Sequence, residues 1–134
     1  MKRIWLLIAA LTVGLSARSF AALGDTEDQI AELLGQPSQS GFPDQRGVST
    51  NVYQKGNYMV LVQFLHHLSL AESYTRTDKA ELRESEIAAL LDGSSNGLKW
   101  IKDPDKPAWI REDHKARAWC ETVSGRPSLL LQAQ

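Results

Sequence analysis

The chain has 134 residues, with 15 Lys and Arg against 16 Asp and Glu, which gives a formal net charge of −1 at pH 7. This balance excludes the strongly basic surface with which nucleic-acid-binding proteins neutralise phosphates, so nucleic acid is not a predicted partner. The one cysteine cannot form an internal disulfide, and the length suits one domain whose hydrophobic core needs neither metals nor disulfides. No cofactor is predicted.

The first 21 residues have the features of a cleaved secretory signal peptide. Lys2-Arg3 precedes an apolar run over residues 4–15, and Ser19-Phe20-Ala21 supplies the small residues needed before a cut at Ala21/Ala22. The run is shorter than the about 20 residues of a spanning helix, and no lipid-accepting cysteine follows it. We predict a signal peptide over 1–21, a single α+β domain over 22–134, and a periplasmic or secreted protein with no stable membrane anchor after cleavage.

A short helix is predicted directly after this segment. Thr26 and Gln29 form a capping-box pair at its start, and Gly35 marks its end. Residues 38–50 follow no helical or strand period and are rich in Ser, Gln, Gly and Pro, which predicts a surface loop where a partner could bind. The candidate contact residues in this loop are Phe42 and Arg46.

The middle of the chain alternates in a way typical of strands. From Asn51 to Tyr74 the period is two, and turns at Lys55-Gly56-Asn57 and His66-His67 divide the segment into three antiparallel strands. A second helix is predicted within residues 78–91, with Asp78 and Glu81 as its capping pair.

The last third returns to strand patterns. Turns are predicted at Glu112-Asp113-His114 and Ser124-Gly125-Arg126, with strands on both sides of each. The order of helix, strands, helix and strands predicts an α+β fold in which two short helices pack on one face of an antiparallel β-sheet.

A set of residues spread over most of the predicted domain carries a family resemblance. It comprises Leu23-Gly24-Asp25-Thr26, Gln29, Gly35, Pro37, Tyr53, Gly56, Val60, Val62, Phe64, Ala71, Tyr74, Glu86-Ile87, Leu90-Leu91, Trp100, Trp109 and Arg111. These residues resemble a family of small uncharacterised exported bacterial proteins. The short helix ending in Leu-Gly-x-Pro before a hairpin is more distantly similar to the BamE/SmpA outer-membrane assembly factors and the β-lactamase inhibitor protein. The resemblance implies their α+β fold and supplies no catalytic residues.

Tryptophans supply the clearest binding candidates outside the loop. At strand spacing Trp119 shares a face with Arg117, opposite Ala118 and Cys120, which makes Trp119 the best candidate for an exposed contact. Trp100 and Trp109 either extend this patch or close the core at the sheet edge. The candidate binding residues are Trp119, Arg117, Trp109, Arg111, Trp100, Phe42 and Arg46.

An enzyme that uses His66, His67, His114 or Cys120 is the alternative interpretation. Adjacent histidines on a strand point to opposite faces, so they hold one metal only if a turn reorients them. No oxyanion-hole or strained-turn motif surrounds the cysteine. We therefore predict a non-catalytic exported protein-binding module whose partner is another envelope or extracellular protein. A metal-dependent or thiol enzyme remains the alternative.

Overall fold

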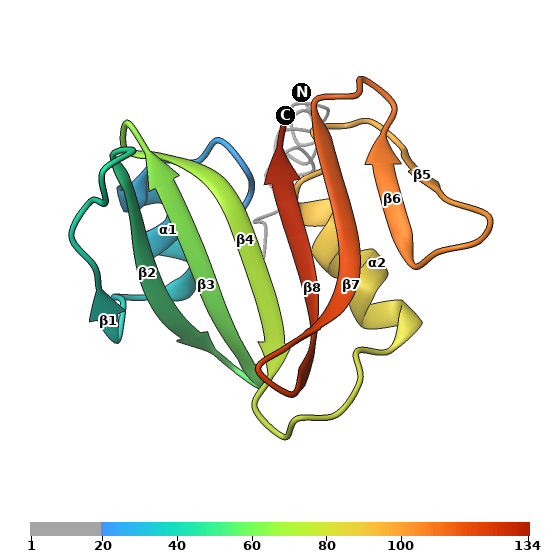
Figure 1. The fold of residues 1–134 in the computed structure, drawn as a ribbon, viewed down its shortest axis with the longest axis horizontal. Coiled ribbons are helices and arrows are strands. Elements are labelled where there is room, and N and C mark those ends of the chain that lie inside the picture. The colour runs from blue at the N-terminus through green and yellow to red at the C-terminus, as the bar shows by residue number, and fades with distance from the viewer. Residues whose placement is uncertain (1–19) are drawn as a thin grey trace, which may run out of the picture.

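One eight-stranded antiparallel sheet dominates the computed structural model, which describes residues 20–134. The predicted signal peptide, apart from its last two residues, lies outside them. The helices are α1 (Glu27–Leu34) and α2 (Glu84–Gly93); the strands are β1 (Gln39–Ser40), β2 (Val48–Lys55), β3 (Tyr58–Leu65), β4 (Leu68–Arg76), β5 (Trp100–Lys102), β6 (Ala108–Arg111), β7 (Ala116–Val123) and β8 (Arg126–Ala133). The strand order is β1-β2-β3-β4-β8-β7-β6-β5 (Figure 1).

Two strand meanders meet at the centre of the sheet. The first runs from β1 to β4 and the second from β5 to β8, and they join where β4 pairs with β8. This join extends from the pair Ala71 and Gln132 to the pair Thr75 and Ser128. Because β4 and β8 lie far apart in the sequence, this pairing sets which side chains of the two halves become neighbours.

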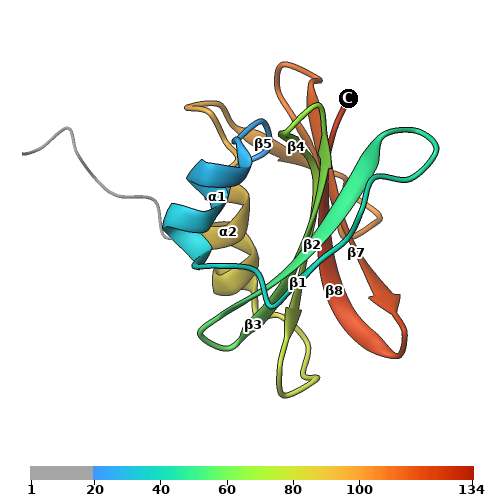
Figure 2. The same cartoon turned by 90° about the vertical axis from the view of Figure 1, so that its left-hand side faces the viewer.

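Both helices cover the same face of the sheet, as Figure 2 shows. Ile30 and Leu34 of α1 and Leu90 and Leu91 of α2 are buried there. Alternate strand residues complete the core, namely Tyr53, Val60, Val62, Phe64, Tyr74, Ala118, Leu129 and Leu131. Within residues 20–134, no helix is long and apolar enough to cross a membrane.

The predicted BamE-like α+β fold is wrong, because the protein is mainly β. Helix accounts for about 16% and strand for about 44% of the structure. The helices have 8 and 10 residues. The sheet is wider than expected because residues 39–40, 100–102 and 108–111 add strands at its two sides. Two short helices on one face therefore do not define the class.

Local predictions have mixed outcomes. The three-stranded meander is confirmed as β2, β3 and β4, and the capping box of Thr26 and Gln29 is present. The loop predicted over residues 38–50 is shorter, since it lies between β1 and β2. The second helix begins only at Glu84. Its predicted start fails because the Asp78 carboxylate instead accepts hydrogen bonds from the Arg76 guanidinium and the Ala80 backbone N–H.

A charge network ties the end of β4 to α2. The Arg76 guanidinium donates two hydrogen bonds to Asp78, at 2.9 and 2.6 Å, and contacts both carboxylate oxygens of Glu86 at 2.9 Å. The Tyr58 hydroxyl donates to Glu86, and burial together with this carboxylate raises the pKa of Tyr58 to about 12. The network fixes α2 against the lower end of the first meander.

This network makes stability fall in acid. The Arg76 hydrogen bonds hold the pKa of Asp78 well below its usual value. Desolvation opposes ionisation of Glu86, but hydrogen bonds from Tyr58, Arg83 and Arg76 outweigh it and lower its pKa. The unfolded chain therefore binds more protons below about pH 5, and this stabilisation is present at neutral pH and lost as pH falls.

We expect Asp78→Asn and Glu86→Gln each to flatten the dependence of unfolding free energy on pH between about 5 and 2. Urea denaturation across this range measures the slope. Glu84→Gln, an exposed carboxylate on the same helix, is the matched control and should leave the slope unchanged. Equal slopes in all three variants and the parent protein would contradict the network's role.

Candidate functional site

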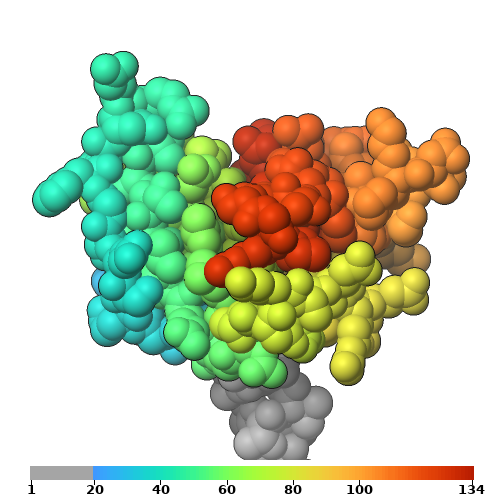
Figure 3. Space-filling view, turned by 60° about the horizontal axis from the view of Figure 1, so that its bottom comes forward, coloured from blue at the N-terminus to red at the C-terminus, as the bar shows by residue number. Residues whose placement is uncertain are grey.

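The sheet face away from the helices carries a groove of about 310 Å³. Its floor is β4, which places the small residues Ala71 and Ser73 on this face. The flanking strands β3 and β8 carry larger side chains at the paired positions, so they stand above β4 on both sides. Figure 3 shows this recess between the green strands of the first meander and the red β7–β8 hairpin.

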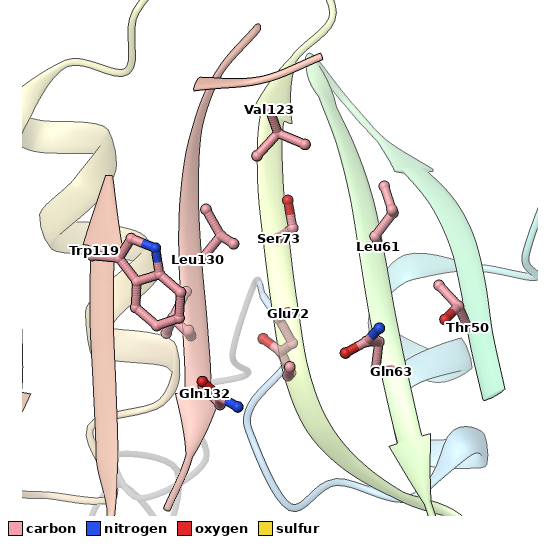
Figure 4. A pocket seen from close by; sticks show the side chains of 11 residues that line it. Thr50, Leu61, Gln63, Glu72, Ser73, Trp119, Val123, Leu130 and Gln132 are labelled. Atoms are coloured by element: carbon pink, nitrogen blue, oxygen red, sulfur yellow. The ribbon is translucent and has the colours of Figure 1, made fainter. Parts of the chain in front are cut away.

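Strand register arranges the groove walls in two rungs. Leu61 of β3 and Leu130 of β8 both pair with Ser73. Gln63 of β3 and Gln132 of β8 both pair with Ala71. Two leucines thus face each other at one level and two amides at the next, as Figure 4 shows. Successive rungs lie two residues apart along each strand, a distance of about 7 Å.

Trp119 extends the leucine rung onto β7. It pairs with Leu130, and Figure 4 shows its indole reaching from β7 toward β8. The Arg117 guanidinium lies 4.8 Å from the indole centroid and donates to the Gln132 side-chain oxygen at 3.1 Å. Val123, which is 40% exposed, stands at the rim. The predicted pairing of Trp119 with Arg117 on one face is confirmed.

The remaining candidate residues lie elsewhere. Trp100 and Trp109 pack against the hydrophobic core on the helix side, and Trp100 Nε1 donates to the Leu91 carbonyl at 2.8 Å. Arg111 donates to the Ser94 carbonyl at 2.9 Å and is bound to Asp113. These residues hold the end of α2 against β5 and β6. They therefore close the core and do not extend the Trp119 patch.

The two loop candidates do not line the groove. Phe42 is 95% exposed between β1 and β2, at the opposite side of the sheet from β5. Arg46 forms a 3.1 Å ion pair with Asp44 of the same loop. Of the seven candidates, the structure thus brings Trp119 and Arg117 together on the groove face and places the other five elsewhere.

The histidines and the cysteine are dispersed. His66 and His67 form the two-residue turn between β3 and β4 with positive φ angles of 53° and 65°, and His114 lies in the turn between β6 and β7. Within residues 20–134, no group of three His, Cys, Asp or Glu side chains could hold a metal ion. Cys120 lies on the helix face, where burial raises the pKa of its thiol. This protonation disfavours the thiolate that nucleophilic chemistry requires.

Sequence reasoning missed the groove residues on β3, β4 and β8. Their signal was present as alternation, with small side chains on one face of β4 and larger ones on its neighbours. It could not be read before the pairing of β4 with β8 was known.

No family model matches the sequence, and no curated protein matches it either. Among solved structures, the fold is similar to a cysteine-rich secretory protein from Staphylococcus aureus subsp. aureus Mu50, with 15% sequence identity and a TM-score of 0.45. The similarity covers 84% of this chain and 44% of that protein, so this chain spans less than half of its length. A likeness at this score carries no conclusion about function.

The expected resemblance to the BamE/SmpA factors and the β-lactamase inhibitor protein is wrong. No family model matches the sequence, so neither this resemblance nor the one to small exported bacterial proteins is supported, and the structure is mainly β. The resemblance rested on a capped helix followed by a hairpin. Capping and turn rules are local, and they produce the same motif in unrelated folds.

Proposed function

We propose that this protein is a non-catalytic, exported binding module whose groove holds an extended segment of another envelope or extracellular protein. The observation that carries the proposal is the groove on the uncovered sheet face, where Trp119 adjoins the paired leucines Leu61 and Leu130. Large aromatic side chains in partly enclosed positions are typical centres of binding energy in protein interfaces.

The spacing of the groove favours an extended chain. In a strand, side chains point the same way every second residue, about 7 Å apart. The leucine rung accepts an apolar side chain, and the amides of Gln63 and Gln132 can donate to and accept from peptide groups one rung away. An extended segment lying along β4 thus meets two apolar side chains at one level of the groove and two amide side chains at the next.

Charge favours one feature of that segment. The exposed Arg117 guanidinium lies beside the amide rung, where it contacts Gln132. An acidic side chain or a terminal carboxylate on the bound segment would place a negative charge against this cation. Such a contact adds specificity and speeds association more than it adds affinity.

Export is part of the same proposal. The basic start and the apolar run over residues 4–15 support transfer across the membrane, followed by removal of the leader. We therefore place the working protein in the periplasm or outside the cell. The competing enzyme hypothesis requires several of the residues His66, His67, His114 and Cys120 to act together, whereas the histidines lie in two separate turns and Cys120 lies on β7.

The groove proposal predicts that Trp119→Ala weakens peptide binding by about 30-fold, because a central aromatic contact contributes about 2 kcal/mol. Peptides are selected from a random heptapeptide phage library on the purified protein, and their affinities are measured by calorimetry. We expect selected sequences to carry apolar residues at every second position.

Phe42→Ala removes an exposed aromatic side chain outside the groove and is the matched control, with affinity unchanged. A second arm titrates chitotriose, since sugar rings also stack on tryptophan. Selected peptides that bind Trp119→Ala as tightly as the parent, or chitotriose binding in place of peptide binding, would overturn the proposed partner.

A further inference from the structure

Hydrogen bonds anchor the chain to the fold from Ala22 onward. The Ala22 N–H donates to Asp25 Oδ2 at 3.0 Å, and the Asp25 N–H donates back to the Ala22 carbonyl at 3.1 Å. The Leu23 N–H donates to Ser94 Oγ at 3.1 Å. The Gly24 N–H and the Asp25 carbonyl bind the backbone of Ser69 at 2.9 and 2.8 Å. Ala22 and Asp25 are each 8% exposed.

The two residues before Ala22 are held by contacts of a different kind. The Phe20 ring lies edge-on to Tyr58 and Tyr74, with ring centroids 5.8 and 6.1 Å apart. The Ala21 carbonyl oxygen lies 3.4 Å from the Tyr74 hydroxyl oxygen. A Cβ on Gly93 would lie 3.3 Å from this carbonyl, so α2 ends closely against it. Packing, therefore, holds Phe20 and Ala21 between α2 and the sheet.

We propose that cleavage of the Ala21–Ala22 bond creates an ion pair between the new α-ammonium group of Ala22 and the Asp25 carboxylate. This inference rests on the proposed export of the chain. Hydrolysis consumes one water: the Ala21 carboxylate departs with the leader, and the Ala22 nitrogen gains protons to become a cation. In place, it stands 3.0 Å from Asp25 Oδ2, where a neutral amide stood before.

The surroundings suit a charged terminus at this point. Ala22 borders a cleft that also contains Gln29, Asp92, Asn96 and Arg111. Water in the cleft can reach the ammonium protons that do not face Asp25. Before the cut the donor is a neutral amide, and after the cut it is a cation, so Coulomb attraction to Asp25 is added to a contact that already exists.

Processing then changes the balance of folding. Before the cut, Phe20 packs on two tyrosines and Ala22 offers a neutral donor. After the cut, the aromatic contact is lost and the ion pair is gained. The ion pair between the Ala22 ammonium group and Asp25 thus forms only once the leader is removed. The precursor folds without the stabilisation that this ion pair supplies.

The first test is the start of the exported protein, determined by intact mass and N-terminal sequencing. We expect Ala22. A start at any other residue overturns this proposal alone, whereas an uncut chain in the envelope fraction contradicts both it and export through a cleaved leader. Peptide binding to the groove is measured separately and does not depend on this result.

The second test is a thermodynamic cycle on the processed protein. Acetylation of the α-amine should lower Tm by several degrees with Asp25 present and have little effect in Asp25→Asn. Asp28→Asn, an exposed carboxylate in α1, is the control and should keep the full effect of acetylation. Equal effects of acetylation in the parent protein and in Asp25→Asn would overturn the pair.

A measurement that needs no variant covers the case in which Asp25→Asn does not fold. The α-amine of the processed protein should react with an N-hydroxysuccinimide ester at least ten times more slowly than the same amine in urea-unfolded protein. A model peptide amine, measured with and without urea, corrects for the effect of urea on the reaction itself. Equal rates would mean that the terminus is free in solution, which also overturns the proposal.

Discussion

Phe64→Ala is expected to lower the free energy of unfolding by about 3–5 kcal/mol, the usual effect of truncating a buried phenylalanine. Phe64 is 1% exposed and lies on β3 in the core that both helices cover. Truncation removes apolar contacts and leaves a cavity that a close-packed sheet cannot readily fill. Urea denaturation measures the loss.

Phe42→Ala is the matched control for this prediction. It makes the same chemical change at a side chain that is 95% exposed, so its effect should stay within about 0.5 kcal/mol. A similar loss in both variants would mean that the core is not where the structure places it.

The second large effect concerns the buried carboxyl group of Glu72 on β4. Glu72 is 2% exposed, and it accepts hydrogen bonds from the Ser69 and Tyr74 hydroxyls, each at 2.9 Å. Tyr74→Phe keeps the ring and removes one of these donors. Because removing a donor from a buried acceptor costs about 1–3 kcal/mol, we expect a loss of about 2 kcal/mol in urea denaturation.

Tyr53→Phe provides the comparison, since Tyr53 is 1% exposed and its hydroxyl accepts from the neutral Asn51 amide at 3.2 Å. We expect a loss of about 1 kcal/mol, as is typical of a neutral hydrogen bond. Should Tyr53→Phe be the more damaging of the two, the expected role of the hydrogen bond from Tyr74 to Glu72 would be contradicted.

Local order was predictable from the sequence where adjacent residues determine it. Period-two alternation and the turn at His66-His67 predicted β3 and β4, and the same alternation placed Trp119 and Cys120 on opposite faces. Both are short-range properties of an extended chain. The structure adds that the two histidines occupy the left-handed region, which fits a tight hairpin turn.

Long-range pairing was not predictable in this way. The groove depends on Ser73 lying between Leu61 and Leu130, and the second of these neighbours comes from the far end of the chain. No local pattern specifies that β4 pairs with β8. The predicted start of α2 at Asp78 was wrong for a related reason. The Asp78 side chain could cap a helix, but it accepts a hydrogen bond from Arg76 of β4 instead.

The two outer strands are very short, with two residues in β1 and three in β5. A strand added to either border would find few unpaired peptide groups, so the sheet offers little template for growth into larger β-assemblies. The truncated borders therefore disfavour edge-to-edge association, while the broad uncovered face of the sheet stays available for contact.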